Sequence, residues 1–100
     1  MAIVMHLRWE GITPAQYDQA CEQVGWETVV PEGAVFHVAS FSNGGIDVTD
    51  VWDSAEQFQA FADQRLLPVL KGKLAFPGEP VVTVEPAYRV FDAKRVGARS

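Results

Sequence analysis

The chain has 100 residues, of which 48% are hydrophobic and 21% charged, and a formal net charge of −5 at pH 7. One domain is the usual expectation for this length. The acidic balance argues against nucleic acid or an anionic membrane surface as a partner, because both attract a basic face. The apolar run at residues 1–5 is interrupted by His6 and is too short for a signal peptide or a membrane span. We therefore expect a cytoplasmic protein, and the lone Cys21, which has no intrachain partner for a disulfide, fits a reducing compartment.

The first third of the chain predicts a strand followed by a helix. Residues 2–9 alternate apolar side chains in the way that an extended strand does. Thr13 is the expected N-cap of the helix, and Gln16 stands three residues later, as in a capping box. Gly25 is the expected C-terminal cap. Residues 26–33 then predict a connector.

The remaining chain predicts a hairpin, a second helix and a fourth strand. Residues 34–41 and 46–52 are rich in β-branched and aromatic side chains and flank a Ser-Asn-Gly-Gly turn. Ser54 predicts the N-cap of the second helix. Pro68 is expected to end or kink that helix, because the residue before a proline avoids helical geometry. A further turn through Val69 and Leu70 can then reach a stop at Gly72. After a loop with proline and glycine, residues 81–85 predict the fourth strand.

This order of elements, β-α-β-β-α-β, predicts an α+β ferredoxin-like fold. Right-handed crossovers then place both helices on one face of a four-stranded antiparallel sheet. We expect residues 1–91 to form this single domain. Residues 92–100 contain few apolar side chains and are expected to be a flexible C-terminal tail.

The sheet is expected to have two apolar faces, of which the two helices can cover only one. To the helix-covered face we assign Ile3, Met5, Leu7, Trp9, Phe36, Val38, Val51, Val82 and Val84. The opposite face then carries Val4, Val35, Ala39, Phe41, Ile46, Val48, Trp52 and Val81. Exposed apolar area on that scale usually marks an interface. The simplest cover is a second copy of the same sheet, so we expect a homodimer formed through the open sheet face, enclosing a barrel.

The open face is also expected to hold a ligand pocket, because polar groups are set among its apolar side chains. These polar groups are His6, Arg8, His37, Asp50, Thr83 and Glu85. We expect contacts with a small hydrophobic or aromatic substrate from His6, Arg8, Phe41, Trp52 and Thr83. Two structural alternatives stay open, since Arg8 can pair with Glu85 across neighbouring strands and Trp52 can be a fixed interface aromatic.

Three short stretches carry a resemblance to a known family. They are FHVA at residues 36–39, VWDS at 51–54 with Glu56 and Phe58 after it, and RLLP at 65–68. With them the chain resembles the dimeric α/β-barrel superfamily, and within it the small antibiotic-biosynthesis-monooxygenase-like proteins of bacteria. The resemblance implies a homodimer with a cavity on the concave sheet face of each subunit. It also implies one activity from a range that includes cofactor-independent oxygenation of aromatic or polyketide substrates, isomerisation, and binding without catalysis.

The haem-degrading branch of that superfamily does not match this chain. That branch uses an asparagine on the first strand with a histidine and a tryptophan associated with the second helix. Here the only asparagine, Asn43, lies in a turn, and the second helix has neither of the other two residues. We therefore expect no haem, and no other cofactor.

His37 is the best candidate for chemistry, because it interrupts an apolar strand and can accept a proton near neutral pH. If Asp50 on the neighbouring strand reaches it, the carboxylate would orient the imidazole. The pair would then be catalytic, with His37 as a base that deprotonates a phenolic or enolic substrate. The structural alternative is a buried histidine that is hydrogen-bonded for stability. His6 could join the pair as a metal ligand, but no short ligand motif supports a metal site.

Three functions are therefore compared. The first is a cofactor-free monooxygenase or isomerase of small aromatic or polyketide-like compounds. The second is a homodimer that binds a small hydrophobic ligand without catalysis. The third is a structural or regulatory dimer, in which Trp52 and Phe41 would block any cavity.

Overall fold

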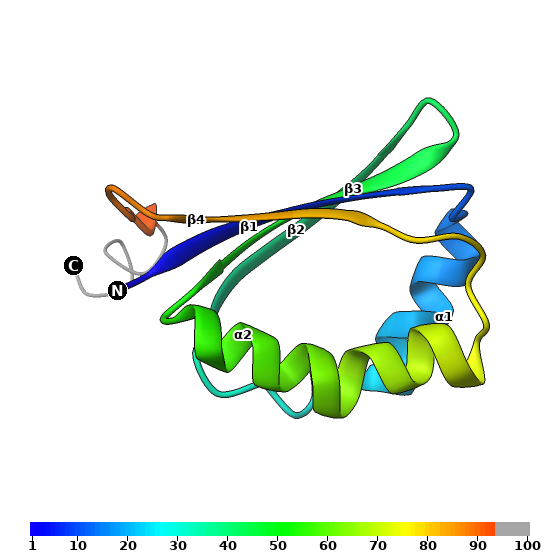
Figure 1. Ribbon diagram of the computed structural model, residues 1–100, viewed down its shortest axis with the longest axis horizontal. Coiled ribbons are helices and arrows are strands. Elements are labelled where there is room, and N and C mark those ends of the chain that lie inside the picture. The colour runs from blue at the N-terminus through cyan, green and yellow to red at the C-terminus, as the bar shows by residue number, and fades with distance from the viewer. Residues whose placement is uncertain (94–100) are drawn as a thin grey trace.

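The computed structural model describes residues 1–93 and shows a sheet with helices against one face (Figure 1). The elements are β1 (Ile3–Glu10), α1 (Pro14–Val24), β2 (Ala34–Ser42), β3 (Gly45–Trp52), α2 (Ala55–Phe61), η1 (Ala62–Leu66), η2 (Pro68–Lys73) and β4 (Val81–Pro86). All pairings are antiparallel, and the strand order is β2-β3-β1-β4. The predicted α+β ferredoxin-like fold is confirmed. Most of the predicted tail, residues 94–100, lies outside the described residues.

The first helix is fixed at both ends by local hydrogen bonds that the sequence predicts. The Thr13 hydroxyl accepts from the backbone N–H of Gln16 at 3.2 Å, and the Gln16 side chain accepts from the backbone N–H of Thr13 at 2.8 Å. This reciprocal pair is a capping box. At the other end, Gly25 has a left-handed φ of 73°, and its N–H donates to the Cys21 carbonyl at 2.9 Å.

The second helix continues past Pro68. Ser54 caps α2 as expected, since its hydroxyl accepts from the N–H of Gln57. Beyond α2 the chain continues in the wider π turns of η1 and η2, and Pro68 takes the first position of η2. The first turn is where a missing N–H costs least. An end of the helix at Pro68 is therefore excluded, whereas the further predicted turn through Val69 and Leu70 is found, and the helical path reaches Lys73.

The hairpin between β2 and β3 turns at Asn43 and Gly44. Their φ values are 49° and 78°, and two positive φ values in succession are typical of a two-residue type I′ turn. The Gly44 carbonyl accepts from the N–H of Gly11 at 2.8 Å, which ties the hairpin to the end of β1. None of the helices in residues 1–93 combines the length and the apolar character needed to cross a membrane.

The strand register corrects the predicted assignment of the two sheet faces. Met5 lies opposite Asp50, and Asp50 lies opposite His37, so all three point to the helix-covered face. The same face holds Ile46, Val48, Trp52, Ala39 and Phe41. Placing these residues on the open face was wrong. Because the polar Asp50 and His37 lie on the covered face, polarity along the chain does not distinguish one face from the other.

A shift of register at the start of β2 also contributes to the difference between the predicted and the observed faces. Ala34 pairs with Trp52 and Phe36 pairs with Val51, so the register shifts at Val35. A bulged residue breaks the simple alternation of side chains. Ala34 and His37 consequently share the covered face, although strict alternation places them on opposite faces.

The open face of the sheet carries exposed apolar side chains, partly from other residues than predicted, beside polar ones such as His6, Arg8 and Thr83. Phe36, Val38 and Val51, which we assigned to the covered face, lie here with Val4 and Val81. The exposed fraction is 58% for Phe36, 47% for Val38 and 68% for Val81. The isolated chain therefore presents large apolar side chains in a place where a solvated sheet carries polar ones.

Candidate functional site

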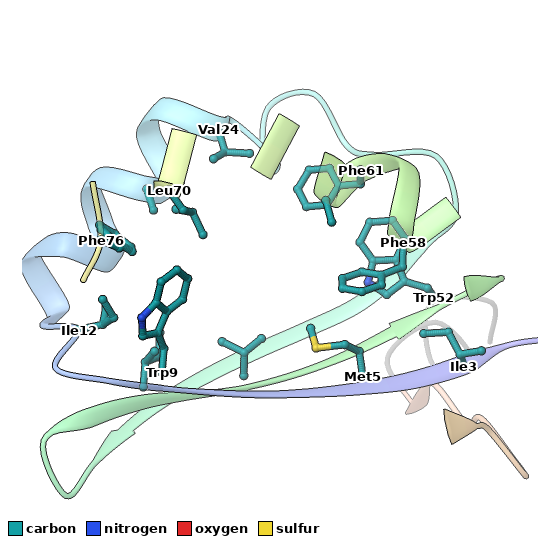
Figure 2. Packing of buried hydrophobic residues seen from close by; sticks show 14 residues of the cluster. Ile3, Met5, Trp9, Ile12, Val24, Trp52, Phe58, Phe61, Leu70 and Phe76 are labelled. Carbon is teal, nitrogen blue, oxygen red and sulfur yellow. The ribbon is translucent and has the colours of Figure 1, made fainter. Parts of the chain in front are cut away.

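A cavity of about 240 Å³ lies between the sheet and the helices. Figure 2 shows its apolar surroundings, with Met5, Trp9 and Trp52 from the sheet side and Phe58, Phe61 and Leu70 from the helix side. Trp52 meets Phe58 and Phe61 with ring centroids 5.6 and 5.4 Å apart. These walls are aromatic and aliphatic, as is usual for a site that takes a small organic ligand.

A line of hydrogen bonds runs from the wall of this cavity towards solvent. The Trp52 indole N–H donates to Asp50 Oδ2 at 3.1 Å, and Asp50 Oδ1 lies 2.6 Å from His37 Nδ1. On the other side of the imidazole, His37 Nε2 lies 2.7 Å from the Tyr17 hydroxyl. The prediction that Asp50 would reach His37 is confirmed by these distances.

The hydrogen-bond partners on the two sides of the imidazole determine which of its nitrogens carries the proton in the neutral ring. A carboxylate only accepts, so the Nδ1 atom that faces Asp50 carries a proton. In the neutral ring, Nε2 is then the acceptor and receives the Tyr17 O–H. Asp50 is the only charged residue among residues 1–93 that is buried, and both of its oxygens are hydrogen-bonded. The His37 side chain keeps 32% of its surface exposed, so it stands at the edge of the cavity.

Tyr17 reaches His37 from α1, and the hydroxyl of its ring meets the imidazole edge on. The two rings are parallel within 1° and their centroids are 6.1 Å apart. Burial raises the pKa of the Tyr17 phenol well above its ordinary value. Burial likewise raises the pKa of the Cys21 thiol. Tyr17 therefore stays protonated and acts as a donor to His37.

Trp26 completes the aromatic surroundings of His37. Its ring centroid lies 5.4 Å from that of His37 and 5.9 Å from that of Tyr17, and it lines the cavity. The indole nitrogen of Trp26 is buried and has no hydrogen-bond partner among the described residues.

Three residues that we expected beside His37 lie on the other side of the sheet. His6 pairs in register with Thr49 and Thr83, and its Nδ1 is 3.1 Å from the Thr49 hydroxyl. Arg8 lies on the same open face, with its guanidinium 2.8 Å from Asp47 and 2.9 Å from Glu10. Grouping His6, Arg8 and Thr83 with His37 was therefore wrong, because the strands pair in the other phase.

Of the remaining predictions near the site, the one for Trp52 is found in the structure and those for Phe41 and the Arg8–Glu85 pair are not. Trp52 lines the cavity as expected, whereas Phe41 only touches Tyr17 edge-on, with centroids 6.0 Å apart. The suggested pair of Arg8 with Glu85 is wrong, since Glu85 lies opposite Val4.

The suggested metal trio is also excluded by the two sheet faces. Its members, His6, His37 and Asp50, do not come together, because His6 lies on the open face. Across residues 1–93, no cluster of three or more His, Cys, Asp or Glu side chains could hold a metal ion.

Two residues of the site escaped the sequence analysis. Tyr17 was given no role from the sequence, and Trp26 was part of the predicted connector at residues 26–33. A helix residue that combines a ring with a hydroxyl, and a large aromatic directly after a Gly C-cap, are the only signals that the sequence offers.

The comparisons with known proteins agree with this fold. No family model and no curated protein matches the sequence. Among solved structures, a variant of SnoaB, a cofactor-independent oxygenase from Streptomyces nogalater, matches with a TM-score of 0.67 at 15% identity, over 89% of this chain and 95% of that one. A proposed antibiotic biosynthesis monooxygenase from Caulobacter crescentus gives 0.67 at 12% identity, over 88% and 91%.

A third similar structure is Rv0793 from Mycobacterium tuberculosis, with a TM-score of 0.66 at 11% identity over 93% of this chain and 99% of that one. At such identities the likeness establishes the fold alone. The chain thus has the fold of the antibiotic-biosynthesis-monooxygenase-like structures, and the resemblance predicted from the sequence is confirmed at that level.

Proposed function

We propose that this protein is a cofactor-independent monooxygenase of small hydroxylated aromatic compounds. The observation that carries the proposal is the Asp50–His37 pair at the edge of an apolar cavity. An imidazole held by a carboxylate on one nitrogen can take a proton with the other. Several proteins of this fold are oxygenases by name, including the cofactor-independent SnoaB.

The proposed reaction starts when His37 Nε2 takes the proton of a phenolic or enolic hydroxyl. To reach that nitrogen, the substrate hydroxyl displaces the Tyr17 hydroxyl. The resulting anion carries electron density to a ring carbon and reduces dioxygen, forming a carbon–oxygen bond. For a substrate with a reacting CH₂ group, one oxygen atom becomes the new carbonyl. The other leaves as water with the two hydrogens, and His37 returns its proton during this loss.

The volume of the cavity supports a small substrate. A cavity of about 150 Å³ accommodates a molecule of the size of benzene, and typical ligand sites measure about 300–1,000 Å³. The cavity of about 240 Å³ therefore suits one or two rings, and a third ring would extend past His37 towards solvent.

The proposal includes a homodimer formed through the open sheet face. The exposed Phe36 and Val38 support it, because they adjoin Val51 and Val4 on that face, and an exposed apolar patch is typical of an interface. Two-fold pairing of identical sheets would cover the same patch on both chains.

The test is oxygen uptake by the purified protein on a panel of naphthols, quinols and hydroxylated anthrones. We expect His37→Ala to lower turnover by at least about 100-fold, the usual contribution of a general base. His37→Asn keeps a donor for Asp50 while removing the base, and it should lose as much. His6→Ala is the matched control, because His6 lies on the opposite face, and it should keep its activity. Normal turnover by a folded His37→Asn variant would refute the proposal.

A second candidate function is ligand binding without catalysis. It is favoured by the Tyr17 hydroxyl, which already occupies the Nε2 atom that the proposed base needs. In that case the same aromatic compounds would raise the melting temperature without yielding product. The third function, a dimer with a filled interior, is disfavoured by the cavity, which Trp52 lines but does not fill.

A further inference from the structure

The Trp26 indole is the one side chain of the site whose hydrogen-bonding capacity is unused. Its Nε1 atom is buried and lacks a partner among the described residues. In contrast, the indole of Trp9 donates to the Pro77 carbonyl at 2.7 Å and that of Trp52 donates to Asp50 at 3.1 Å. A buried donor without a partner is rare and costly, so each instance calls for an explanation.

The backbone next to Trp26 is well fixed. A loosely placed loop therefore does not explain the unpaired indole N–H. Trp26 follows the left-handed C-cap Gly25. Arg65 holds the same backbone, because its guanidinium donates to the carbonyls of Val24 and Gly25 at 3.1 and 3.4 Å. The guanidinium in turn lies 5.3 Å from the centre of the Phe61 ring. The backbone directly before Trp26 is thus held in place, while the indole N–H of Trp26 remains unpaired.

Trp26 lies where a ligand in the cavity could contact it. Trp26 lines the cavity, and its ring centroid is 5.4 Å from that of His37. The two rings are therefore neighbours at the cavity wall, and two substituents of one small ring system can reach both of them. A ligand whose hydroxyl meets His37 can therefore bring a second oxygen to the indole.

We propose that Trp26 is a positioning residue whose indole N–H donates to an acceptor oxygen of the ligand, a carbonyl on the same ring system as the hydroxyl that faces His37. The inference rests on the proposed function only in placing the ligand in this cavity. It assigns to Trp26 a preference for hydroxyaryl ketones over simple phenols, because only the ketone satisfies the buried N–H.

The test compares two probes that differ by one carbonyl, 7-hydroxy-1-tetralone and 5,6,7,8-tetrahydro-2-naphthol. Binding is measured by titration, without turnover, so that a failure of catalysis and a failure of this inference remain distinguishable. The wild-type protein should bind the tetralone more tightly. Trp26→Phe should weaken tetralone binding roughly three- to tenfold, the effect of one hydrogen bond, and change naphthol binding by less than about twofold.

A ¹H–¹⁵N NMR spectrum of the three indole N–H groups gives a second measurement, which is made on the wild-type protein. The Trp26 proton should move downfield on addition of the tetralone and not of the naphthol, and its signal is assigned by its loss in Trp26→Phe. For stability the matched variant is Trp9→Phe, which loses the bond to Pro77 and should be destabilised more than Trp26→Phe.

Several outcomes would overturn the inference. Equal weakening of both probes by Trp26→Phe would show a packing role alone. An unshifted Trp26 signal, no preference of the wild type for the tetralone, or no saturable binding of either probe would each contradict it. Destabilisation of Trp26→Phe as large as that of Trp9→Phe would show that the indole N–H has a partner within the protein.

Discussion

Asp50 is the residue at which the requirements of folding and of the site meet. A buried carboxylate is costly unless its oxygens are bonded, and here His37 and Trp52 each take one oxygen. The same two bonds fix the imidazole and the indole at the cavity wall. Because both functions depend on one side chain, we interpret Asp50 as an orienting residue and His37 as the residue that contacts substrate.

Tyr17 provides a residue-scale prediction about pH. Burial raises the pKa of its phenol above the ordinary value of 10.0, so the folded protein retains this proton where the unfolded chain loses it. Stability must then fall as pH rises above about 10. Between pH 8 and pH 11, wild-type protein should lose more unfolding free energy than Tyr17→Phe. The difference should be about 1 kcal/mol or less, since the half-buried phenol is partly screened by solvent.

The measurement is urea unfolding at the two pH values. Tyr88→Phe is the control, because Tyr88 is fully exposed and its replacement should leave the pH dependence at the wild-type value. A Tyr17→Phe variant that loses as much stability as wild type between pH 8 and pH 11 would contradict the assigned role of burial.

At the scale of elements, the loop between α1 and β2 connects the site to the second helix. The N–H of Asp53, just before α2, donates to the Gly33 carbonyl at 2.8 Å. Gly33 has a φ of 87°, and a Cβ at this position would overlap the side chain of Gln57. The loop that carries Trp26 is therefore seated directly on the first turn of α2.

Gly33→Ala tests this seating. The substitution should destabilise the protein for two reasons, the left-handed backbone and the overlap with Gln57. Gly11→Ala is a matched control, since Gly11 has a φ of 79° but open space around the same position. We expect Gly33→Ala to cost at least about 1 kcal/mol more than Gly11→Ala in chemical unfolding. Equal costs would show that the loop is not held closely against α2.

At the scale of the whole molecule, the sequence predicts the elements well and the sheet phase poorly. The caps at Thr13, Gly25 and Ser54 are local signals, and all are found where expected. The phase of one strand against the next depends on tertiary packing. Both faces of this sheet carry apolar and polar side chains, and the polar pair of Asp50 and His37 lies under the helices, so hydrophobic pattern alone could not assign the faces.

In the site, too, some contacts follow from local sequence and others depend on tertiary packing. The contact of His37 with Asp50 follows from a hairpin register that the turn at Asn43 specifies. The contribution of Tyr17 depends on how α1 packs on the sheet, and that of Trp26 on a loop held by Arg65. Local sequence marks each of these residues at most weakly and specifies neither arrangement.

The proposed dimer gives a prediction for the assembled molecule. Phe36→Glu places a charge on the apolar part of the open face, on the edge strand β2, where the wild-type ring is 58% exposed. The fold of a single chain should therefore survive, while the interface should not. Light scattering at micromolar concentration should give twice the 11.0 kDa chain mass for wild type and a single chain mass for Phe36→Glu. A wild-type monomer would contradict the interpretation of the open face.

The central claim is that ligand binds between the sheet and the helices, next to His37, and not on the open face. Isotope-filtered NMR of the complex with 5,6,7,8-tetrahydro-2-naphthol tests it most directly. Met5 lines the cavity, and Val38 lies on the opposite face of the sheet. We predict nuclear Overhauser contacts from the probe to the Met5 methyl group and none to the Val38 methyl groups. Contacts to Val38 without contacts to Met5 would contradict the account.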